Sequence, residues 1–369
     1  MKNPTKLLLV VSALFGTASS VAQTVPQSAT LYENVRVFDG TSEKLTPPTN
    51  VLVVGNLIKS ISSQPIEIPS GVVATRIAGD GRTLMPGLSD AHTHLWLTAT
   101  LDELLKGDVA ALNATASATS KQMLLNGFTT VRDMAGPVFQ IKSDIDSGKA
   151  IGPRIYPSGT MITQTSGHGD FSAPEALPRS LGGPLSIGEQ LRISSVVDGR
   201  AQVLTAVRFN LRNGASQIKL ATSGGVSSAD DTPTVHEFTS DEIKAAVEAA
   251  SDFGTYVSVH AYNTESVRRS VDAGVKVIEH GQLLDEATVK YLKDKDIWLS
   301  TQNFEEFDDS YTPFQRLKEH EVVQGENNVY QWAVQNNVKL AWGTDFFFQP
   351  AGPVKDDHAE RQFIYYRRR

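Results

Sequence analysis

Six side chains of the kinds that bind metal ions lie within or at the ends of short apolar runs of this sequence. They are His92, His94, Lys219, His260, His280 and Asp345. Imidazole and carboxylate groups are ligands of Zn²⁺ and other first-row ions, and the chain has no cysteine that could supply a thiolate. The set therefore predicts a metal site with nitrogen and oxygen ligands, of the kind that hydrolytic enzymes use.

The clearest local signal is the pair His92 and His94, which a single residue separates. Alternate residues of a strand point to the same side, so both imidazoles can bind one ion. Such a pair by itself also occurs as hydrogen-bonded core histidines. Lys219 stands between Ile218 and Leu220, a position that disfavours a solvent-exposed lysine. The common register of all six residues with predicted strands favours ligand roles for the set.

Eight apolar, strand-like runs alternate with helical segments along most of the chain. The runs are 84–91, 129–134, 154–158, 217–222, 256–261, 276–280, 297–301 and 339–345. Helix starts are signalled by a capping box at Thr239–Glu242 and by N-caps at Asn263 and Asp285. The alternation predicts an α/β fold, a (β/α)8 TIM-like barrel, whose strand ends would bring the six candidates to one rim. A doubly wound sheet is the competing prediction, but no glycine-rich strand–turn–helix fingerprint supports it.

The chain divides into four segments by composition. Residues 1–22 have a basic start, a short apolar run and a small-x-small end before Gln23, which predicts a cleaved signal peptide and export to the periplasm or the medium. An amphipathic or buried N-terminal helix is the alternative; the run is too short to span a bilayer, and no other stretch is long and apolar enough to do so. Residues 23–84 predict a small β-sandwich appendage, and residues 85–345 the hydrolase barrel. The tail, 346–369, holds neither a long amphipathic helix nor alternating strands, so we expect a shortened C-terminus.

One connection, 160–216, is long, and within it residues 164–190 are rich in Gly, Pro and Ser. Loops of this kind are usually lids over a site or simply mobile segments.

The overall composition excludes several classes of protein. The chain has 369 residues, 40% of them hydrophobic and 20% charged, which is a globular balance. The formal net charge of −7 argues against a nucleic-acid partner or an anionic membrane surface. The lack of cysteine excludes a disulfide framework and a cysteine nucleophile. A monomer and a homo-oligomer both remain open.

Several phrases of the sequence resemble the amidohydrolase superfamily. They are 86–94 (PGLSDAHTH), 128–133 (FTTVRD), 166–169 (SGHG), 218–225 (IKLATSGG) and 260–262 (HAY). The order His-x-His, Lys, His, His, Asp is similar to the two-metal branch. The likeness is closer to metal-dependent Xaa-Pro and Xaa-Arg dipeptidases, prolidase-like carboxypeptidases and ochratoxin-type amidases, and runs from about residue 30 to Asp345.

The resemblance implies a role for each candidate residue. His92, His94 and Asp345 would bind the more buried of two divalent ions, with zinc as the default, and His260 and His280 would bind the second. Lys219 would be carboxylated and bridge both ions. A carbamate suits that position, because a cationic ammonium would be repelled by two cations, and lysine shifts its charge state readily when buried.

The expected activity is hydrolysis of an amide bond in a small peptide or N-acyl amino acid by a metal-activated hydroxide. As a hypothesis, Asp345 would be the proton carrier, His168 would hold the substrate or its oxyanion, and Tyr262 would contact the substrate. A simple turn is the alternative for His168. A cyclic-amide hydrolase resembling imidazolonepropionase, and an inactive shortened remnant, are the alternative functions.

Overall fold

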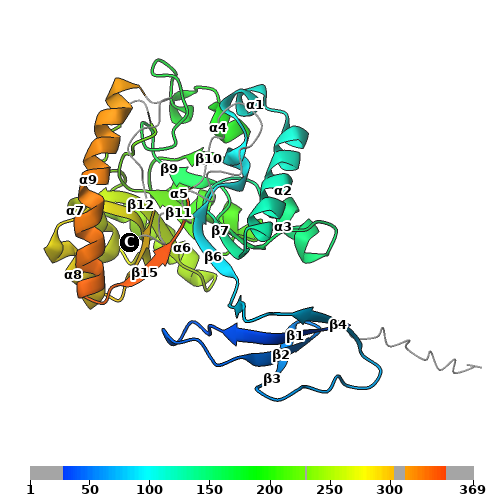
Figure 1. The fold of residues 1–369 in the computed structure, drawn as a ribbon. Helices are drawn as coiled ribbons and strands as arrows, with labels where there is room; N and C mark the ends of the chain where they lie inside the picture. The colour runs from blue at the N-terminus through cyan, green and yellow to red at the C-terminus, as the bar shows by residue number, and fades with distance from the viewer. Residues whose placement is uncertain (1–27, 229–230, 303–311, 346–369) are drawn as a thin grey trace, which may run out of the picture. The chain divides into compact units, whose positions relative to one another are not determined.

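The computed structural model describes residues 28–228, 231–302 and 312–345, which form a mixed α/β protein with parallel sheets (Figure 1). The chain separates into two compact units, Met1–Pro86 and Gly87–Arg369. The predicted signal peptide and the tail 346–369 lie outside the described residues. In the described part, no helix is both long and apolar enough to cross a membrane.

The N-terminal unit contains one five-stranded sheet of mixed direction, with the order β3-β2-β1-β4 and β5 paired to β1. Its strands are β1 Ser28–Val37, β2 Thr49–Val54, β3 Leu57–Ser62, β4 Val73–Ala78 and β5 Thr83–Leu84. The hairpin of β2 and β3 turns at Gly55, whose φ of +60° suits a two-residue turn of this kind. Ala29, Leu31 and Leu52 form the buried centre of a small apolar cluster. The sequence predicted a small β-sandwich for this segment, and the described residues form a single sheet instead.

The C-terminal unit holds two sheets in which every strand pair is parallel, in the orders β6-β7-β8 and β10-β9-β11-β12-β13-β14-β15. The strands are β6 Leu88–Thr93, β7 Phe128–Asp133, β8 Arg154–Pro157, β9 Met161–Thr163, β10 Ser194–Val196, β11 Ile218–Ala221, β12 Val257–Asn263, β13 Val277–Leu283, β14 Trp298–Thr301 and β15 Lys339–Trp342. Each of the eight predicted runs overlaps one of these strands. The sequence did not indicate β9 and β10, because three residues are too few to show a periodicity.

Helices follow most of these strands and pack against the sheets (Figure 1). They are α1 Leu101–Lys106, α2 Val109–Leu125, α3 Phe139–Asp146, α4 Ile187–Gln190, α5 Arg200–Arg212, α6 Ser240–Asp252, α7 Thr264–Asp272, α8 Glu286–Asp294 and α9 Pro313–Gln335. The predicted caps are confirmed: Thr239 and Glu242 form a reciprocal capping box, and Asn263 and Asp285 each accept a backbone N–H of the helix they open.

Successive side chains along these strands point alternately to the apolar core and to the side of the sheet that faces the pocket. On β12, Val257, Val259 and Ala261 belong to the main apolar cluster, which includes residues of the surrounding helices. His260 and Tyr262, the alternate residues, line a pocket on the opposite side. A second apolar cluster surrounds β6, β7 and α2, so the two sheets both carry packed helices on one face and polar side chains on the other.

The segment after β15 lies directly beside β6. The Asp345 N–H donates to the His92 carbonyl oxygen at 2.7 Å, and Asp90 accepts both the Thr344 N–H at 3.0 Å and its hydroxyl at 2.7 Å. A methyl group on Gly343 would stand 2.5 Å from the His92 backbone nitrogen. Close backbone approach at Gly343 therefore permits these hydrogen bonds between the first and last strands of the unit.

We predict that Gly343→Ala destabilises the protein by about 1–3 kcal/mol, because the added methyl group forces β6 and the β15 end apart. Urea unfolding followed by circular dichroism would measure the change. Val334→Ala, at a side chain that is 66% exposed, should change stability by less than about 0.5 kcal/mol. Equal stability of Gly343→Ala and the unmodified protein would refute the close approach.

Candidate metal centre

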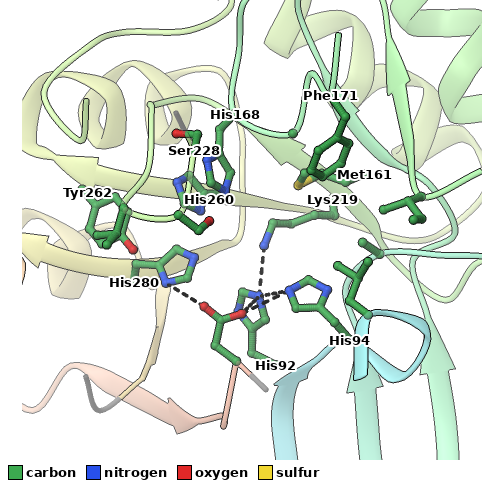
Figure 2. Close-up of a pocket in the computed structure, with 17 residues that line it drawn as sticks. His92, His94, Met161, His168, Phe171, Lys219, Ser228, His260, Tyr262 and His280 are labelled. Atoms are coloured by element: carbon green, nitrogen blue, oxygen red, sulfur yellow. Dashed lines mark hydrogen bonds and ion pairs between the residues drawn. The ribbon is translucent and has the colours of Figure 1, made fainter. Parts of the chain in front are cut away.

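One pocket receives all eight residues that the sequence singled out for ligand or substrate roles. They are His92, His94, His168, Lys219, His260, Tyr262, His280 and Asp345. The pocket encloses about 810 Å³ of empty space, including the part that is open to solvent. Figure 2 shows the seven of these side chains that it labels, directed toward one another from β6 and the residue after it, from β11, β12 and β13, and from the loop after β9. Asp345, which follows β15, lines the same pocket.

The innermost donor atoms lie at nearly equal separations. His92 Nε2 lies 3.3 Å from His94 Nε2 and 3.4 Å from Asp345 Oδ1, and His94 Nε2 lies 3.1 Å from Asp345 Oδ1. Lys219 Nζ lies 3.3 Å from His92 Nε2. Four ligands at 2.0–2.1 Å from a tetrahedral ion are about 3.3 Å from one another. The donor atoms of His92, His94 and Asp345 therefore have the types and the mutual spacing that a zinc-sized ion requires, and Lys219 lies next to them.

His260 and His280 form a second group next to the first. Their ring centroids lie 4.4 Å apart, and His280 Nδ1 lies 3.9 Å from Asp345 Oδ2. Asp345 thus faces the first group with one oxygen and the second group with the other. His168 stacks on His260 at 4.0 Å with an interplanar angle of 10°, and Tyr262 stacks on His280 at 4.9 Å.

Strand β13 turns two successive side chains, Glu279 and His280, toward His92. Strict alternation would direct them to opposite faces. The pairing of β12 with β13 shifts register after His280, which has a φ of +76°. A left-handed conformation is unfavourable for a residue with a Cβ, and such strain is commonly kept where a site needs it. Asp345 also has a positive φ, +50°. Two of the six candidate ligands thus depend on unusual backbone conformations.

A buried ion-pair network orients His92 from behind. Glu279 Oε2 lies 2.9 Å from His92 Nδ1, and Oε1 accepts from Arg132 at 2.5 Å and from the Ser258 hydroxyl. Arg132 also donates to the Ala91 carbonyl oxygen at 2.6 Å. Burial raises the pKa of Glu279, but Arg132 and Lys219 outweigh it, so the net shift is downward. An ionised Glu279 can only accept, so His92 carries its proton on Nδ1 and presents a lone pair on Nε2.

Burial favours the neutral form of three imidazoles in this pocket, those of His92, His260 and His280. It lowers the pKa of His92 and His260 well below the usual value and that of His280 to about 3. Burial also lowers the pKa of Lys219, to about 8. For Asp345, burial favours the neutral form, but His92, His94 and His280 lower its pKa below the ordinary value. A carboxylate among neutral imidazoles is the ionisation state in which all of these groups can bind a cation.

Groups that the sequence did not indicate hold the rim of the pocket. The backbone N–H of His168 donates to the Glu237 carboxylate at 2.8 Å, and Asp231 Oδ2 lies 3.8 Å from Nδ1 of the His168 ring. The buried Lys318 of α9 donates to the carbonyl oxygens of Gly225, Ser228 and Asp231 at 2.6–2.9 Å. Glu237 and Lys318 are about 70 to 90 residues away in sequence from the groups that they contact. Neither residue belongs to one of the motifs, so only the tertiary structure identifies them.

We predict that Glu237 makes the stability of the protein fall as the pH rises. Burial raises the pKa of Glu237 from 4.5 to about 9, so the folded state keeps a proton that the unfolded chain loses. The free energy of unfolding should therefore decrease from about pH 5 to pH 9 and then level off. Glu237→Gln should flatten this dependence in urea titrations at several pH values, whereas Glu175→Gln, an exposed position, should keep it. Parallel curves for all three proteins would contradict the assignment.

Comparisons with known proteins identify the family to which this chain belongs. Residues 83–347 match the amidohydrolase family. Ochratoxinase of Aspergillus niger is 31% identical over 336 residues, an alignment that covers 82% of this chain and 66% of ochratoxinase. This chain therefore spans just under two thirds of the length of that relative.

Two solved structures are similar over most of the chain. A prolidase complexed with N-methylphosphonate-L-proline has a TM-score of 0.79 at 30% identity, covering 87% of this chain and 79% of the prolidase. An Xaa-Pro dipeptidase with bound methionine has a TM-score of 0.78 at 27% identity, covering 92% and 84%. Together with the family match, these likenesses confirm the resemblance that the sequence motifs indicated, and the chain belongs to the amidohydrolase family.

Proposed function

We propose that this protein is a metal-dependent hydrolase that cleaves an amide bond in a small peptide or an N-acyl amino acid. The observation that carries the proposal is the spacing of the donor atoms of His92, His94 and Asp345, 3.1–3.4 Å, which suits a zinc-sized ion. The names of the similar proteins, prolidase, Xaa-Pro dipeptidase and ochratoxinase, support an amide or peptide substrate.

We further propose that the two sheets of the C-terminal unit close into one (β/α)8 barrel. The hydrogen bond from Asp345 to His92 supports closure between the segment after β15 and β6. On the other side, the Ser216 N–H donates to the carbonyl oxygen of Pro157 in β8, just before β11. A closed barrel would explain why side chains from several strands reach one rim.

In this proposal, His92, His94 and Asp345 would hold one divalent ion and His260 and His280 would hold a second. Lys219, as its carbamate, would supply an anionic group to the same centre. The lowered pKa of Lys219, about 8, supports this role, because only the neutral amine reacts with CO2 and the reaction releases one proton. Two bound ions would supply a water acidified toward a pKa of about 7 and an electrophile for the scissile carbonyl group.

The protein's own groups then handle the proton and the substrate. Asp345 accepts the proton of the attacking water on a carboxylate oxygen and later donates it to the leaving amine. His168, which stacks on His260 at the mouth of the metal centre, donates a hydrogen bond to the oxyanion that develops on the substrate. Tyr262 contacts the substrate from the side of His280.

We predict that chelation by EDTA abolishes hydrolysis of N-acyl amino acids and dipeptides and that added zinc restores it. Elemental analysis of the active protein should find about two ions per chain. His94→Asn should lose metal and at least about 100-fold in kcat/KM, because it removes a ligand. His236→Asn, an exposed histidine outside the pocket, is the matched control and should retain both. Full activity of metal-free protein would rule out the scheme, and turnover of ring amides alone would favour a cyclic-amide hydrolase.

We also predict that Glu279→Gln weakens metal binding by about 10–100-fold, because His92 loses its charged partner. Competition with a fluorescent chelator would measure the affinity without any need for turnover. Glu265→Gln, at an exposed carboxylate of α7, should bind metal as the unmodified protein does. An unchanged metal affinity of Glu279→Gln would show that the orientation of His92 does not depend on this carboxylate.

A further inference from the structure

We propose that four apolar side chains of the pocket form a subsite for a bulky apolar acyl group next to the scissile amide. They are Leu97, Met161, Phe171 and Ile193, which we call the apolar wall. The inference rests on the proposed amide hydrolysis and extends it to the class of substrate.

Three residues of the apolar wall are part of the packed core. Leu97, Met161 and Ile193 are 4–8% exposed and belong to the apolar cluster around β6, β7 and α2. Phe171 completes the wall with a ring that is 40% exposed. Figure 2 shows Met161 and Phe171 on the side of the pocket where His94 lies, with Lys219 below them. A large apolar surface that ends beside catalytic groups is typical of a site that binds an apolar ligand group.

Two glycines allow these side chains to occupy their places. A Cβ on Gly169, which has a φ of +88°, would collide with the Met161 methyl group, and a Cβ on Gly188 of α4 would collide with the Phe171 ring. Met161 and Phe171 pack against glycine backbone, and a movement of either side chain away from it would leave a void. The wall is therefore formed in advance, and a ligand does not have to order it.

The segment that carries Phe171 is also held by hydrogen bonds. Asp170 accepts the N–H groups of Ser166 at 2.9 Å and Ser172 at 3.1 Å, and Glu237 accepts that of His168. The two hydrogen bonds to Asp170 fix the local turn on either side of Phe171, and the bond from His168 to Glu237 attaches this turn to the rest of the unit. The ring keeps a defined position relative to His168, the proposed oxyanion donor.

The two sides of the pocket differ in polarity, which assigns the acyl group to the apolar wall. His168 and Tyr262 lie on the opposite side, near His260 and His280 (Figure 2). A leaving amino acid carries a carboxylate, which would lose its hydration without compensation against Leu97, Met161, Phe171 and Ile193. The imidazole and phenol of the opposite side can hydrogen-bond to such a group.

The test measures binding of the product acids to the zinc-loaded, full-length protein. Hexanoate and phenylacetate should bind at least about tenfold more tightly than acetate in calorimetric titrations, since each adds methylene or ring surface to an apolar site. Phe171→Ala should remove most of this preference, and Phe171→Leu should retain most of it for hexanoate. Phe253→Ala, at a ring that is 63% exposed at the end of α6, should leave the preference intact.

The same preference should appear in kcat/KM for N-acetyl-, N-hexanoyl- and N-phenylacetylglycine. Equal affinities of the three acids, or a preference that survives in Phe171→Ala, would overturn the apolar wall. Discrimination among the acids without hydrolysis of any amide would refute the proposed function and leave the subsite standing.

Discussion

The candidate metal centre depends on holding several donor atoms 3.1–3.4 Å apart in a pocket from which most water is excluded. Each of these groups loses hydration on burial, and they gain little from one another when no cation binds them. Local interactions cannot supply such an arrangement, because the donors come from strands far apart in sequence. The surrounding network therefore provides it: Glu279 and Arg132 orient His92, and Asp90 attaches the residues before Asp345 to β6.

The burial that makes this cluster unfavourable in free energy also sets the ionisation states that the proposed chemistry needs. It keeps His92, His260 and His280 neutral, so that their lone pairs are available, and it brings the pKa of Lys219 down to about 8. A single carboxylate, Asp345, stays ionised between the two groups of donors. In the proposed reaction that position lets one side chain serve both ions and move the proton.

The pocket around this cluster has two walls that are stabilised in different ways. The apolar wall is the surface of a packed core, so its shape follows from close packing. The wall near Ser228 is a loop whose carbonyl groups are held by Lys318, and the loop of His168 is attached through Glu237. One wall thus offers apolar surface and the other polar contacts, a division that fits an amide flanked by an acyl group and an amino acid.

The sequence by itself predicted eight runs that overlap strands, the capped helices and the eight candidate residues that the structure brings to one pocket. Periodicity, helix caps and the order of the candidate ligands can each be read from the sequence alone. It did not reveal β9 and β10, the partners Glu279 and Lys318, or the turn of His280 toward the same side as Glu279. Strand alternation assigns adjacent residues to opposite faces, and only the register shift in β13 and a positive φ change that assignment. Packing in three dimensions decides which residues far apart in the chain come into contact. The residue type at any one position of the sequence does not reveal such a contact.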